Sequence, residues 1–477
     1  MSANPFIPDS FIRHITPQLP QNTSLEAFIA ASQIPLRKSI RVNTLKISIV
    51  EFKQLADEYQ WMLTPIPWCE AGFWIETEQD ETSLGNHPAH ISGLFYIQEA
   101  SSMLPVTALF PQGLDLKLTV LDMAAAPGSK TTQIASLMNN SGLLIANEYS
   151  SSRVKILHAN LLRCGVHNAA ISHYDAQVFG EWLPETFDAI LLDAPCSGEG
   201  TIRKDPDALK NWSLDALHSI SSTQKTLIES AFHALKPGGE LVYSTCTLSR
   251  EENQDVCEHL LATFGDSVTK LPLTGLFTGS DAALTTEGYL HVFPEYFDSE
   301  GFFVAKFKKL HAIEPPPSTA KKPRRFPFNQ ASKRDILALE SALLNDLDIT
   351  IPDDRTVWLR DKEIWLFPSD ISPILPKFKF SRIGTKLAEI HKHGYRWQHE
   401  AITALSTGSE SSVITLDDQD LVNEWLMGRD IRPDIPNGGK GEVIVKYETM
   451  VLGIGKWVGN RIKNGLPRDL VKNKVSF

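Results

Sequence analysis

Between residues 116 and 309, short apolar runs that end at polar or small residues alternate with longer segments of helical spacing. Short apolar runs bounded by turn signals are typical of buried strands, and longer amphipathic segments are typical of helices. We predict strands at 118–123, 142–148, 169–174, 187–193 and 240–244, and helices at 130–138, 151–164 and 214–235. Strands that alternate with helices form a parallel sheet covered on both faces. The expected fold class is therefore α/β, with a doubly wound, mostly parallel sheet, and residues 291–293 and 302–307 predict an antiparallel edge hairpin.

The chain is too long for one hydrophobic core. Its 477 residues exceed the size at which single cores stop growing, so several domains are expected. Mixed helix and strand signals predict a small α+β domain at 1–115, ahead of a catalytic domain at 116–309. A proline-rich stretch at 315–319 predicts a linker, followed by a small middle domain, within 310–384. Glycines and short β-type runs predict a β-rich module at 385–477.

The composition is that of a soluble globular protein, with 42% apolar and 22% charged residues. No apolar run approaches the roughly 20 residues that span a bilayer, and the first residues lack a basic segment followed by an apolar one. A cytoplasmic protein without a membrane partner is expected. The five cysteines form no CxxC pair, so neither a disulfide framework nor a metal site is predicted.

Basic residues gather in two places although the net charge is −11. Residues 301–340 carry nine Lys and Arg against three acids, and residues 440–477 carry eight against three. Phosphate binding depends on local patches and not on the charge of the whole chain. The patches favour a nucleic-acid partner, and the alternative is that they are ordinary solvated surface charges.

A loop of small residues follows the first predicted strand of the sheet. It consists of Ala124, Ala125, Ala126, Pro127, Gly128, Ser129 and Lys130. A glycine here lets the backbone approach a ligand, and the start of the next helix favours negative charge. The loop lacks the GxGxxG pattern that the pyrophosphate of NAD or FAD requires.

Acidic residues end the next two strands. Glu148 lies 20 residues after Gly128, where it could bind ribose hydroxyls, and Asp175 could accept a hydrogen bond from an adenine amino group. A nucleoside without phosphates, S-adenosylmethionine, fits this set. The alternative is an ordinary α/β domain with acids at solvent-facing strand ends.

Two cysteines follow the fourth and fifth strands. Cys196 lies in the run Asp193-Ala194-Pro195-Cys196-Ser197-Gly198, and Cys246 in Ser244-Thr245-Cys246-Thr247. The ends of neighbouring parallel strands face one crevice, and a thiol that loses its proton there is a nucleophile. The pattern predicts a covalent, cofactor-dependent enzyme, but spacing alone does not say which thiol attacks.

Several motifs together resemble the NOL1/NOP2/Sun family of RNA cytosine-5 methyltransferases. They are residues 124–130, the run from Asp193 to Pro206, the run Tyr243 to Thr247, and the stretches 41–44 and 96–100. The similarity covers about residues 25–309. The runs 452–456 and 465–467 resemble a PUA-type RNA-binding module. The resemblance implies a Rossmann-like, S-adenosylmethionine-dependent core with a PUA-like C-terminal module.

The resemblance also implies roles for individual residues. Cys246 becomes the nucleophile that adds to C6 of a flipped cytosine, Cys196 assists release, and Asp193 contacts the base edge and lies near the cofactor, while Lys130 acts electrostatically. The implied product is 5-methylcytosine in 16S ribosomal RNA, made by a monomer that acts on RNA within the small subunit, with tRNA as the alternative substrate. Two other hypotheses remain: an enzyme acting on a protein or small molecule with structural thiols, and a non-catalytic RNA-binding protein.

Overall fold

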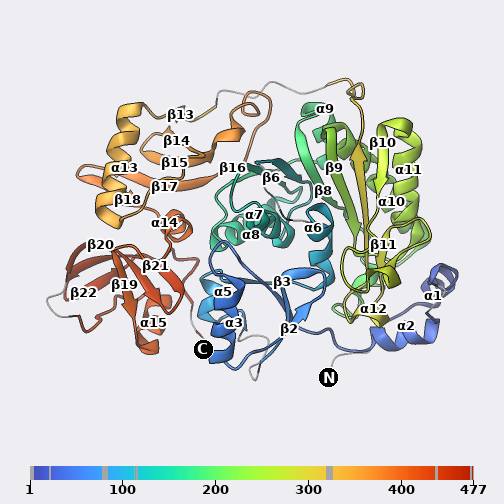
Figure 1. The fold of residues 1–477 in the computed structure, drawn as a ribbon, viewed down its shortest axis with the longest axis horizontal. Helices are drawn as coiled ribbons and strands as arrows, with labels where there is room; N and C mark the ends of the chain where they lie inside the picture. Colours follow the sequence, from blue (N-terminus) through green and yellow to red (C-terminus); the bar gives the residue numbers. More distant parts are fainter. Residues whose placement is uncertain are drawn as a thin grey trace.

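The structure is a computed structural model that describes residues 5–20, 23–77, 84–111, 113, 117–318, 326–435, 439–472 and 475. The described residues form four β-sheets, and the largest lies at the centre of the molecule (Figure 1). Its strand order is β10-β12-β9-β8-β5-β6-β7-β16, with β11 paired to β12.

The middle of this sheet is parallel, as the sequence predicted. Its parallel strands are β5 (Thr119–Asp122), β6 (Leu143–Asn147), β7 (Ala169–Ser172), β8 (Phe187–Asp193) and β9 (Leu235–Thr245). The helices that connect or cover them are α6 (Leu104–Leu109), α7 (Ser129–Leu137), α8 (Ser151–Arg163), α9 (Phe179–Trp182), α10 (Leu214–Ala234) and α11 (Gln254–Phe264). Alternate side chains of the strands enter two separate apolar cores, one on each face of the sheet. The doubly wound α/β fold is confirmed.

The antiparallel strands lie beside β9. β12 (Phe302–Lys309) pairs antiparallel with β9, with β10 (Val268–Leu271) and with β11 (Leu290–Val292). The short helix α12 (Pro294–Phe297) joins β11 to β12. The predicted hairpin is therefore present, and β10 lies outside it at the edge of the sheet.

The N-terminal domain is a small antiparallel sheet joined tightly to the catalytic domain. Its strands are β1 (Ser39–Val42), β2 (Met62–Ile66), β3 (Cys69–Glu76) and β4 (Phe95–Ile97), accompanied by α1 (Asp9–Ile15), α2 (Leu25–Ser32), α3 (Ile49–Glu58) and α5 (Pro88–Ile91). Arg41 of β1 is buried, and its guanidinium donates to Gln98 Oε1 at 2.9 Å and to Thr132 Oγ1 of α7 at 2.7 Å. A buried guanidinium needs such partners, so this contact fixes the domain against the helix that follows the small-residue loop.

The middle domain is a second antiparallel sheet. It contains β13 (Asn329–Gln330), β14 (Arg355–Arg360), β15 (Glu363–Pro368), β17 (Thr385–His391) and β18 (Gly394–Trp397), next to α13 (Lys333–Leu347). The boundary expected at 384/385 divides this sheet, because β15 pairs with β17. Just before it, β16 (Arg382–Ile383) pairs with β7 of the catalytic sheet. Gly384, with a φ of +55°, turns the chain from the catalytic sheet into the sheet of the middle domain. The boundary expected at 384/385 therefore separates these two sheets, and it does not separate the middle domain from the C-terminal module.

The C-terminal module is a small mixed sheet with two helices. It contains α14 (His399–Leu405), β19 (Val413–Leu416), α15 (Gln419–Leu426), β20 (Gly439–Tyr447), β21 (Met450–Gly459) and β22 (Arg461–Asn464). Figure 1 shows the middle domain and this module on the same side of the catalytic sheet, stacked one above the other. In the described part of the chain, no helix is long and apolar enough to cross a bilayer.

Candidate active site at the strand ends

The small-residue loop between β5 and α7 is fixed by the side chains of α8. Arg153 donates to the carbonyl of Ala126 at 2.5 Å, and Asn160 donates to the carbonyl of Pro127 at 2.9 Å. Gly128 has a φ of +111°, and a Cβ there would lie 3.2 Å from Leu157. A side chain at position 128 would therefore be strained, so the glycine keeps the loop in this conformation.

Acidic groups surround this loop at three strand ends. Glu148 is buried and accepts from the backbone N–H of Ser150 at 2.8 Å, with Arg153 Nη1 3.6 Å from its other oxygen. Asp175 is exposed and accepts from the N–H of Gln177 at 3.0 Å, which leaves its second oxygen without a partner among the described residues. The structure thus places Glu148 beside the loop, while Asp175 caps the short helix at Ala176–Val178.

Sequence reasoning missed a third acid, Asp122, at the end of β5. Its side chain is buried and accepts from Thr131 Oγ1 at 2.7 Å, but its Oδ1 has no partner among the described residues. Burial raises its pKa to about 7. The sequence contained a signal for Asp122, because a carboxylate ends the apolar run directly before the small-residue loop.

The two predicted thiols face each other. The sulfur atoms of Cys196 and Cys246 are 3.2 Å apart, and both cysteines are half-buried and free. The contact with Cys246 and burial raise the pKa of Cys196 well above its ordinary value. Within the pair, the thiolate form of Cys196 is therefore disfavoured, because its sulfur is desolvated and lies against a second sulfur.

An ion pair between a buried lysine and a half-buried aspartate lies beside the thiols. Lys130 Nζ is 2.7 Å from Asp193 Oδ2, and Ser244 Oγ donates to the other oxygen of Asp193 at 2.7 Å. Burial alone would lower the pKa of Lys130, but Asp193 and Cys246 more than offset it, so the pKa is raised. The lysine is thus a permanent cation next to Cys246, and an adjacent cation favours a thiolate.

Two buried carboxylates, which sequence reasoning did not single out, hold the two cysteine loops together. Glu199 accepts from Ser249 N at 2.8 Å, from Leu248 N at 3.0 Å, and from the side chains of Thr247 and Trp212 at 2.8 and 2.6 Å. Glu252 accepts from Ser197 N at 3.0 Å and from Gln224 at 2.8 Å.

The same two loops are also joined directly. Ser197 Oγ lies 2.7 Å from Thr247 Oγ1, and the N–H of Gly200 donates to the carbonyl of Cys246 at 2.9 Å. Together with the bonds of Glu199 and Glu252, these bonds hold the two cysteine loops side by side and so determine the distance between the two sulfur atoms. The signal for Glu199 was its position inside the motif that carries Cys196.

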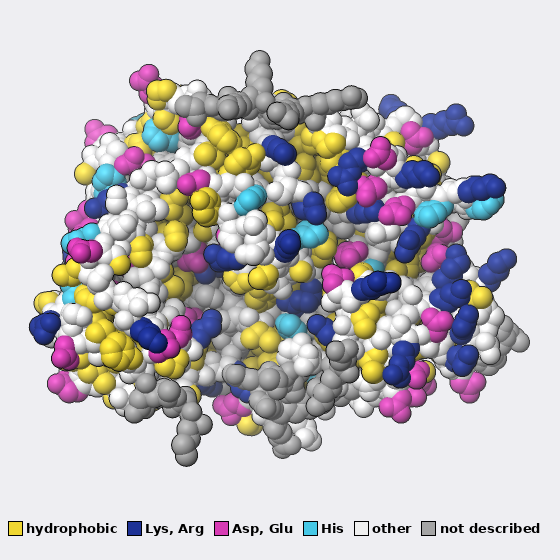
Figure 2. Space-filling model, turned by 180° about the vertical axis from the view of Figure 1, so that it is seen from behind, with side chains coloured by type: hydrophobic (Ala, Val, Ile, Leu, Met, Phe, Trp, Pro, Cys, Tyr) yellow, Lys and Arg dark blue, Asp and Glu magenta, His cyan; other side chains and the backbone are white. Residues whose placement is uncertain are grey.

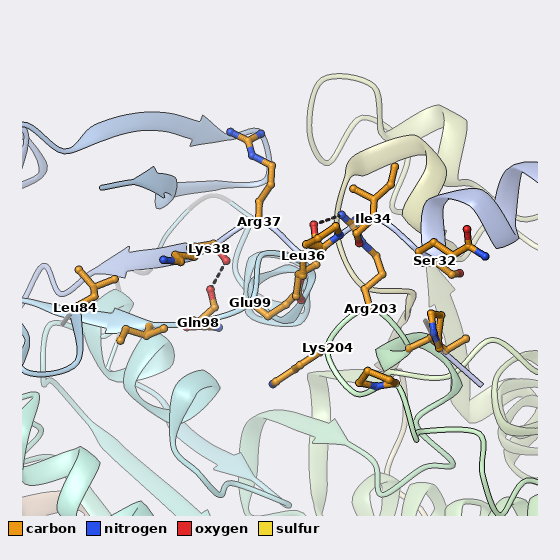
Figure 3. A pocket seen from close by; sticks show the side chains of 17 residues that line it. Ser32, Ile34, Leu36, Arg37, Lys38, Leu84, Gln98, Glu99, Arg203 and Lys204 are labelled. Carbon is orange, nitrogen blue, oxygen red and sulfur yellow. Dashed lines mark hydrogen bonds between the residues drawn. The ribbon is translucent and has the colours of Figure 1, made fainter. Parts of the chain in front are cut away.

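A pocket of about 550 Å³ opens beside these loops, between the N-terminal domain and the loop after Cys196 (Figure 3). Arg203 reaches back to the carbonyls of Ile34 and Pro35, both at 3.0 Å, and so forms part of the wall. Lys204 is exposed, and Arg37 and Lys38 are half-buried on the opposite side.

Neither cysteine lines this pocket, but two acids lie between its lysine and the active-site lysine. Glu99 lines the pocket and accepts from the N–H of Glu300 at 3.1 Å. Burial, followed by the charge of Glu99, raises the pKa of Glu300 to about 8, while Lys204 and Lys130 act in the opposite direction. Glu300 therefore lies within electrostatic reach of both the pocket lysine and the active-site lysine.

The two basic patches differ from each other. In residues 301–340, Lys306 and Lys309 are buried on β12 and paired with Glu240 and Glu185 at 2.8 and 3.1 Å. Four further cations of this patch, Lys321, Lys322, Arg324 and Arg325, lie outside the described residues, as does Lys474 of the second patch. In the C-terminal patch, Lys440, Lys456, Lys463, Arg468 and Lys472 are exposed or half-buried. The described part of the first patch does not form one continuous surface.

The doubly wound sheet, the loop after β5 and the nucleophilic groups at the strand ends define a Rossmann-like methyltransferase. Four family models cover most of the chain. They are the N-terminal domain of 16S rRNA methyltransferase RsmF at residues 7–100, 16S rRNA methyltransferase RsmB/F at 106–308, the pre-PUA domain of ribosomal RNA small subunit methyltransferase F at 328–405, and the methyltransferase RsmF PUA domain at 411–472.

Curated relatives match from end to end. Ribosomal RNA small subunit methyltransferase F of Vibrio parahaemolyticus is 59% identical, and those of Vibrio cholerae and Aliivibrio fischeri are 58% and 57% identical, each over 100% of both chains. The chain belongs to the ribosomal RNA small subunit methyltransferase F family. It is therefore an rRNA methyltransferase that acts on RNA and carries a PUA domain.

Solved structures agree with the fold over about three fifths of the chain. A methyltransferase homolog protein from Pyrococcus horikoshii is 35% identical, with a TM-score of 0.53 over 63% of this chain and 94% of that one. NSun6 from the same organism, solved with SFG, is 24% identical, with a TM-score of 0.52 over 60% of this chain and 94% of that one. The second similarity concerns the fold alone.

Proposed function

We propose that this chain transfers a methyl group to C5 of a cytosine in 16S ribosomal RNA, with S-adenosylmethionine as the methyl donor. The observation that carries the proposal is the contact between Cys196 and Cys246 at 3.2 Å, beside the Lys130–Asp193 ion pair. C5 of cytosine is too weakly nucleophilic to accept a methyl group directly. A thiolate beside a cation would activate the ring by adding to C6 before methylation, and a second, protonated thiol would assist release of the sulfur afterwards.

The strand ends beside the thiols fit the methyl donor. S-adenosylmethionine would supply an electrophilic methyl group when bound. The loop from Ala124 to Lys130 would face the nucleoside, Glu148 would accept from its ribose hydroxyls, and the free oxygen of Asp175 would accept from its adenine amino group. The unpartnered, buried Oδ1 of Asp122 supports a ligand at this place, because buried acceptors are normally satisfied.

Cys246 would activate the cytosine ring. Its thiolate forms a bond to C6, and the electron pair of the C5–C6 double bond makes C5 a nucleophile. Asp193 would contact the N3 and N4 edge of the base, and Lys130 would hold Asp193 and stabilise the thiolate. Once C5 carries the methyl group, its proton passes to water, the electron pair of the C–H bond re-forms the C5–C6 double bond, and the S–C6 bond breaks with its electron pair returning to the sulfur of Cys246. Cys196, held neutral beside Cys246, would assist this release by donating a hydrogen bond to the departing sulfur.

The target base must leave its stack to reach a thiol at the end of a strand. The pocket of Figure 3 supports this, because it opens next to the cysteine loops and carries Lys38 and Lys204 on opposite sides. We propose that these cations contact the phosphates that flank the flipped nucleotide. The active unit would be a single chain, and a small-subunit substrate would locate the reaction in the cytoplasm.

The test compares substrates. The protein is incubated with S-adenosylmethionine labelled in its methyl group and with small-subunit RNA, assembled small subunits or bulk tRNA, and methylated sites are mapped by bisulfite sequencing. The proposal expects 5-methylcytosine at one position of 16S ribosomal RNA, and the same position unmethylated in cells that lack the protein. Label in tRNA alone would reject the 16S substrate, and label outside C5 of cytosine would reject the chemistry.

A further inference from the structure

A second large hollow lies between the middle domain and the C-terminal module, on a different side of the chain from the catalytic loops. It is a groove of about 900 Å³, formed by the β17–β18 hairpin on one side and by strands β21 and β22 with residues 465–468 on the other. Two different sheets therefore supply its walls, so its shape depends on how the middle domain and the C-terminal module are packed.

Cations dominate the lining of this groove. Five basic side chains, from Lys392, Arg396, Lys456, Lys463 and Arg468, face two acidic ones, Glu400 and Glu442, and all five are exposed. One ion pair forms among these side chains: Lys456 Nζ lies 3.0 Å from Glu442 Oε1. Among the described residues, the other four cations form no ion pair within 4 Å, although Arg396 lies across the hairpin from Glu389 and is partly offset by its charge. The cations still outnumber the two acids of the lining, so the groove keeps an excess of positive charge.

The same surface stands out in the view from behind. Figure 2 shows many Lys and Arg side chains, with histidines and several acidic side chains among them, over the part of the molecule formed by the middle domain and the C-terminal module. The histidines of the hairpin, His391 and His393, are exposed at the groove. Unpaired cations that share one surface form a binding site for a polyanion, whose phosphates would relieve their repulsion.

The groove suits a phosphate backbone better than unstacked bases. Of its two aromatic residues, Trp397 is 5% exposed and bonded to Asp346 at 2.9 Å, and Tyr395 is half-buried with its ring 5.3 Å from that of Trp397. Recognition of single strands relies on exposed aromatic rings on which bases stack. The exposed rings of this groove are the two small imidazoles of His391 and His393, and they are outnumbered by five exposed cations. Contact is therefore made mainly through charge and shape, as in the recognition of RNA helices.

We propose that this groove, which we name the hairpin groove, binds the phosphate backbone of a helical segment of the substrate RNA remote from the target cytosine. The inference rests on the proposed RNA substrate and deepens it by naming a second contact. Lys392, Arg396, Lys463 and Arg468 carry the contact. The middle domain thus takes part in RNA binding through β17 and β18, and is more than a spacer between catalysis and the PUA domain.

The experiment measures binding and turnover in parallel. The full-length variant K392A/R396A/K463A/R468A is compared with K210A/K225A/K377A/K379A, which removes four cations that neither line the groove nor belong to the two basic patches. Binding of small-subunit RNA is measured from about 50 to 300 mM salt. The groove variant is expected to lose about 100-fold in affinity near 0.1 M salt, and the slope of log K against log salt is expected to fall by about three. The control is expected to change little.

Turnover separates this inference from the proposed chemistry. The groove variant is expected to raise KM for RNA and to keep kcat within about twofold, because the strand-end groups are untouched. The variant R396K/R468K, which keeps the charge, is expected to bind like the original protein. A fall in melting temperature shared by both quadruple variants would be corrected for by comparing them at a temperature where both are folded.

Three outcomes would overturn the inference. Equal affinity of the groove variant and the control for naked RNA is one. Loss of affinity for assembled subunits but not for naked RNA would assign the groove to a ribosomal protein instead. A loss of kcat without a change in affinity would also contradict it. If the protein binds RNA through the groove but makes no 5-methylcytosine, the groove stands and the proposed chemistry fails.

Discussion

The cysteine loops and the hairpin groove are both built from residues far apart in the sequence, yet they are stabilised in opposite ways. In the cysteine loops, the carboxylates of Glu199 and Glu252 are fully buried and bonded to the neighbouring backbone. In the hairpin groove, Lys392 and Arg396 are exposed and unpaired among the described residues. The first arrangement fixes atoms to a fraction of an ångström, and the second supplies charge without fixing position.

The difference teaches which kind of perturbation each region resists. A buried network fails as a unit when one member is removed, because the remaining donors lose their acceptor. An exposed set of cations weakens step by step, and salt weakens it too. Substitutions in the cysteine loops should therefore act on turnover and stability, and substitutions in the hairpin groove should act on affinity.

The largest effect is expected from Cys246→Ala. Removal of the attacking sulfur should lower methyl transfer by a factor on the order of 10⁴ or more, because no other group can form the bond to C6. Transfer of labelled methyl to small-subunit RNA measures the effect. Cys257→Ala, which removes a buried thiol outside the site, is the control and should retain activity. A Cys246→Ala protein with normal turnover would end the proposed mechanism.

Glu199→Gln should damage the loop network next most strongly. The amide keeps only one accepting oxygen, so its NH2 group would face either Trp212 or the N–H groups of Leu248 and Ser249, and the buried donors on that side would lose their acceptor. We expect the free energy of unfolding to fall by about 3 kcal/mol and kcat to fall at temperatures where the protein is still folded. Denaturant unfolding measures the first value. Glu340→Gln, at an exposed site, should change neither, and an equal loss there would show that the effect is not specific to the network.

Much of the catalytic domain could be predicted from the sequence, and the reasons are local. The strands from β5 to β8 are short apolar runs closed by a polar or small residue, and so is the second half of β9, so the edge at which Cys196 and Cys246 lie follows from the pattern. The first half of β9, residues 235–239, contains a proline and two glycines and was not predicted as strand. The class of enzyme followed from the motifs around these strand ends, and the family comparison confirms it.

The parts that could not be predicted depend on contacts between distant segments. Glu199 and Glu252 look like surface acids until the fold surrounds them with donors. The strand β16 pairs with β7 from more than 200 residues away, and nothing in its two residues indicates this. Lys306 and Lys309 counted toward a basic patch, but they are buried and paired across the sheet.

A smaller, pH-dependent effect is expected from Glu300. Its pKa is raised to about 8 by burial and Glu99, so between about pH 5 and 8 the folded chain holds a proton that the unfolded chain has lost. The contribution of this group to stability is therefore greatest at low pH and falls as pH rises toward 8. Glu300→Gln should flatten the decline of the unfolding free energy by more than about 1 kcal/mol across this interval. Identical pH profiles for the two proteins would contradict the assignment, and Glu340→Gln again provides the comparison.

The smallest effect should come from a single cation of the hairpin groove. Lys463→Ala is expected to weaken RNA binding a few-fold and to reduce the salt slope by about one, with kcat unchanged. Lys463→Arg, which keeps the charge, should behave like the original protein. A change in kcat in Lys463→Ala would contradict the distinction drawn here, in which the cysteine loops determine turnover and the hairpin groove determines affinity.

The most direct test of the account uses Cys196→Ala with small-subunit RNA and S-adenosylmethionine. If Cys246 adds to the base and Cys196 assists release, this variant should accumulate a covalent protein–RNA complex that survives a denaturing gel. Digestion and mass spectrometry should then find the nucleotide on the peptide that contains Cys246, and Cys196→Ala/Cys246→Ala should form no complex. A stable complex in Cys246→Ala, with none in Cys196→Ala, would contradict the roles assigned to the two thiols.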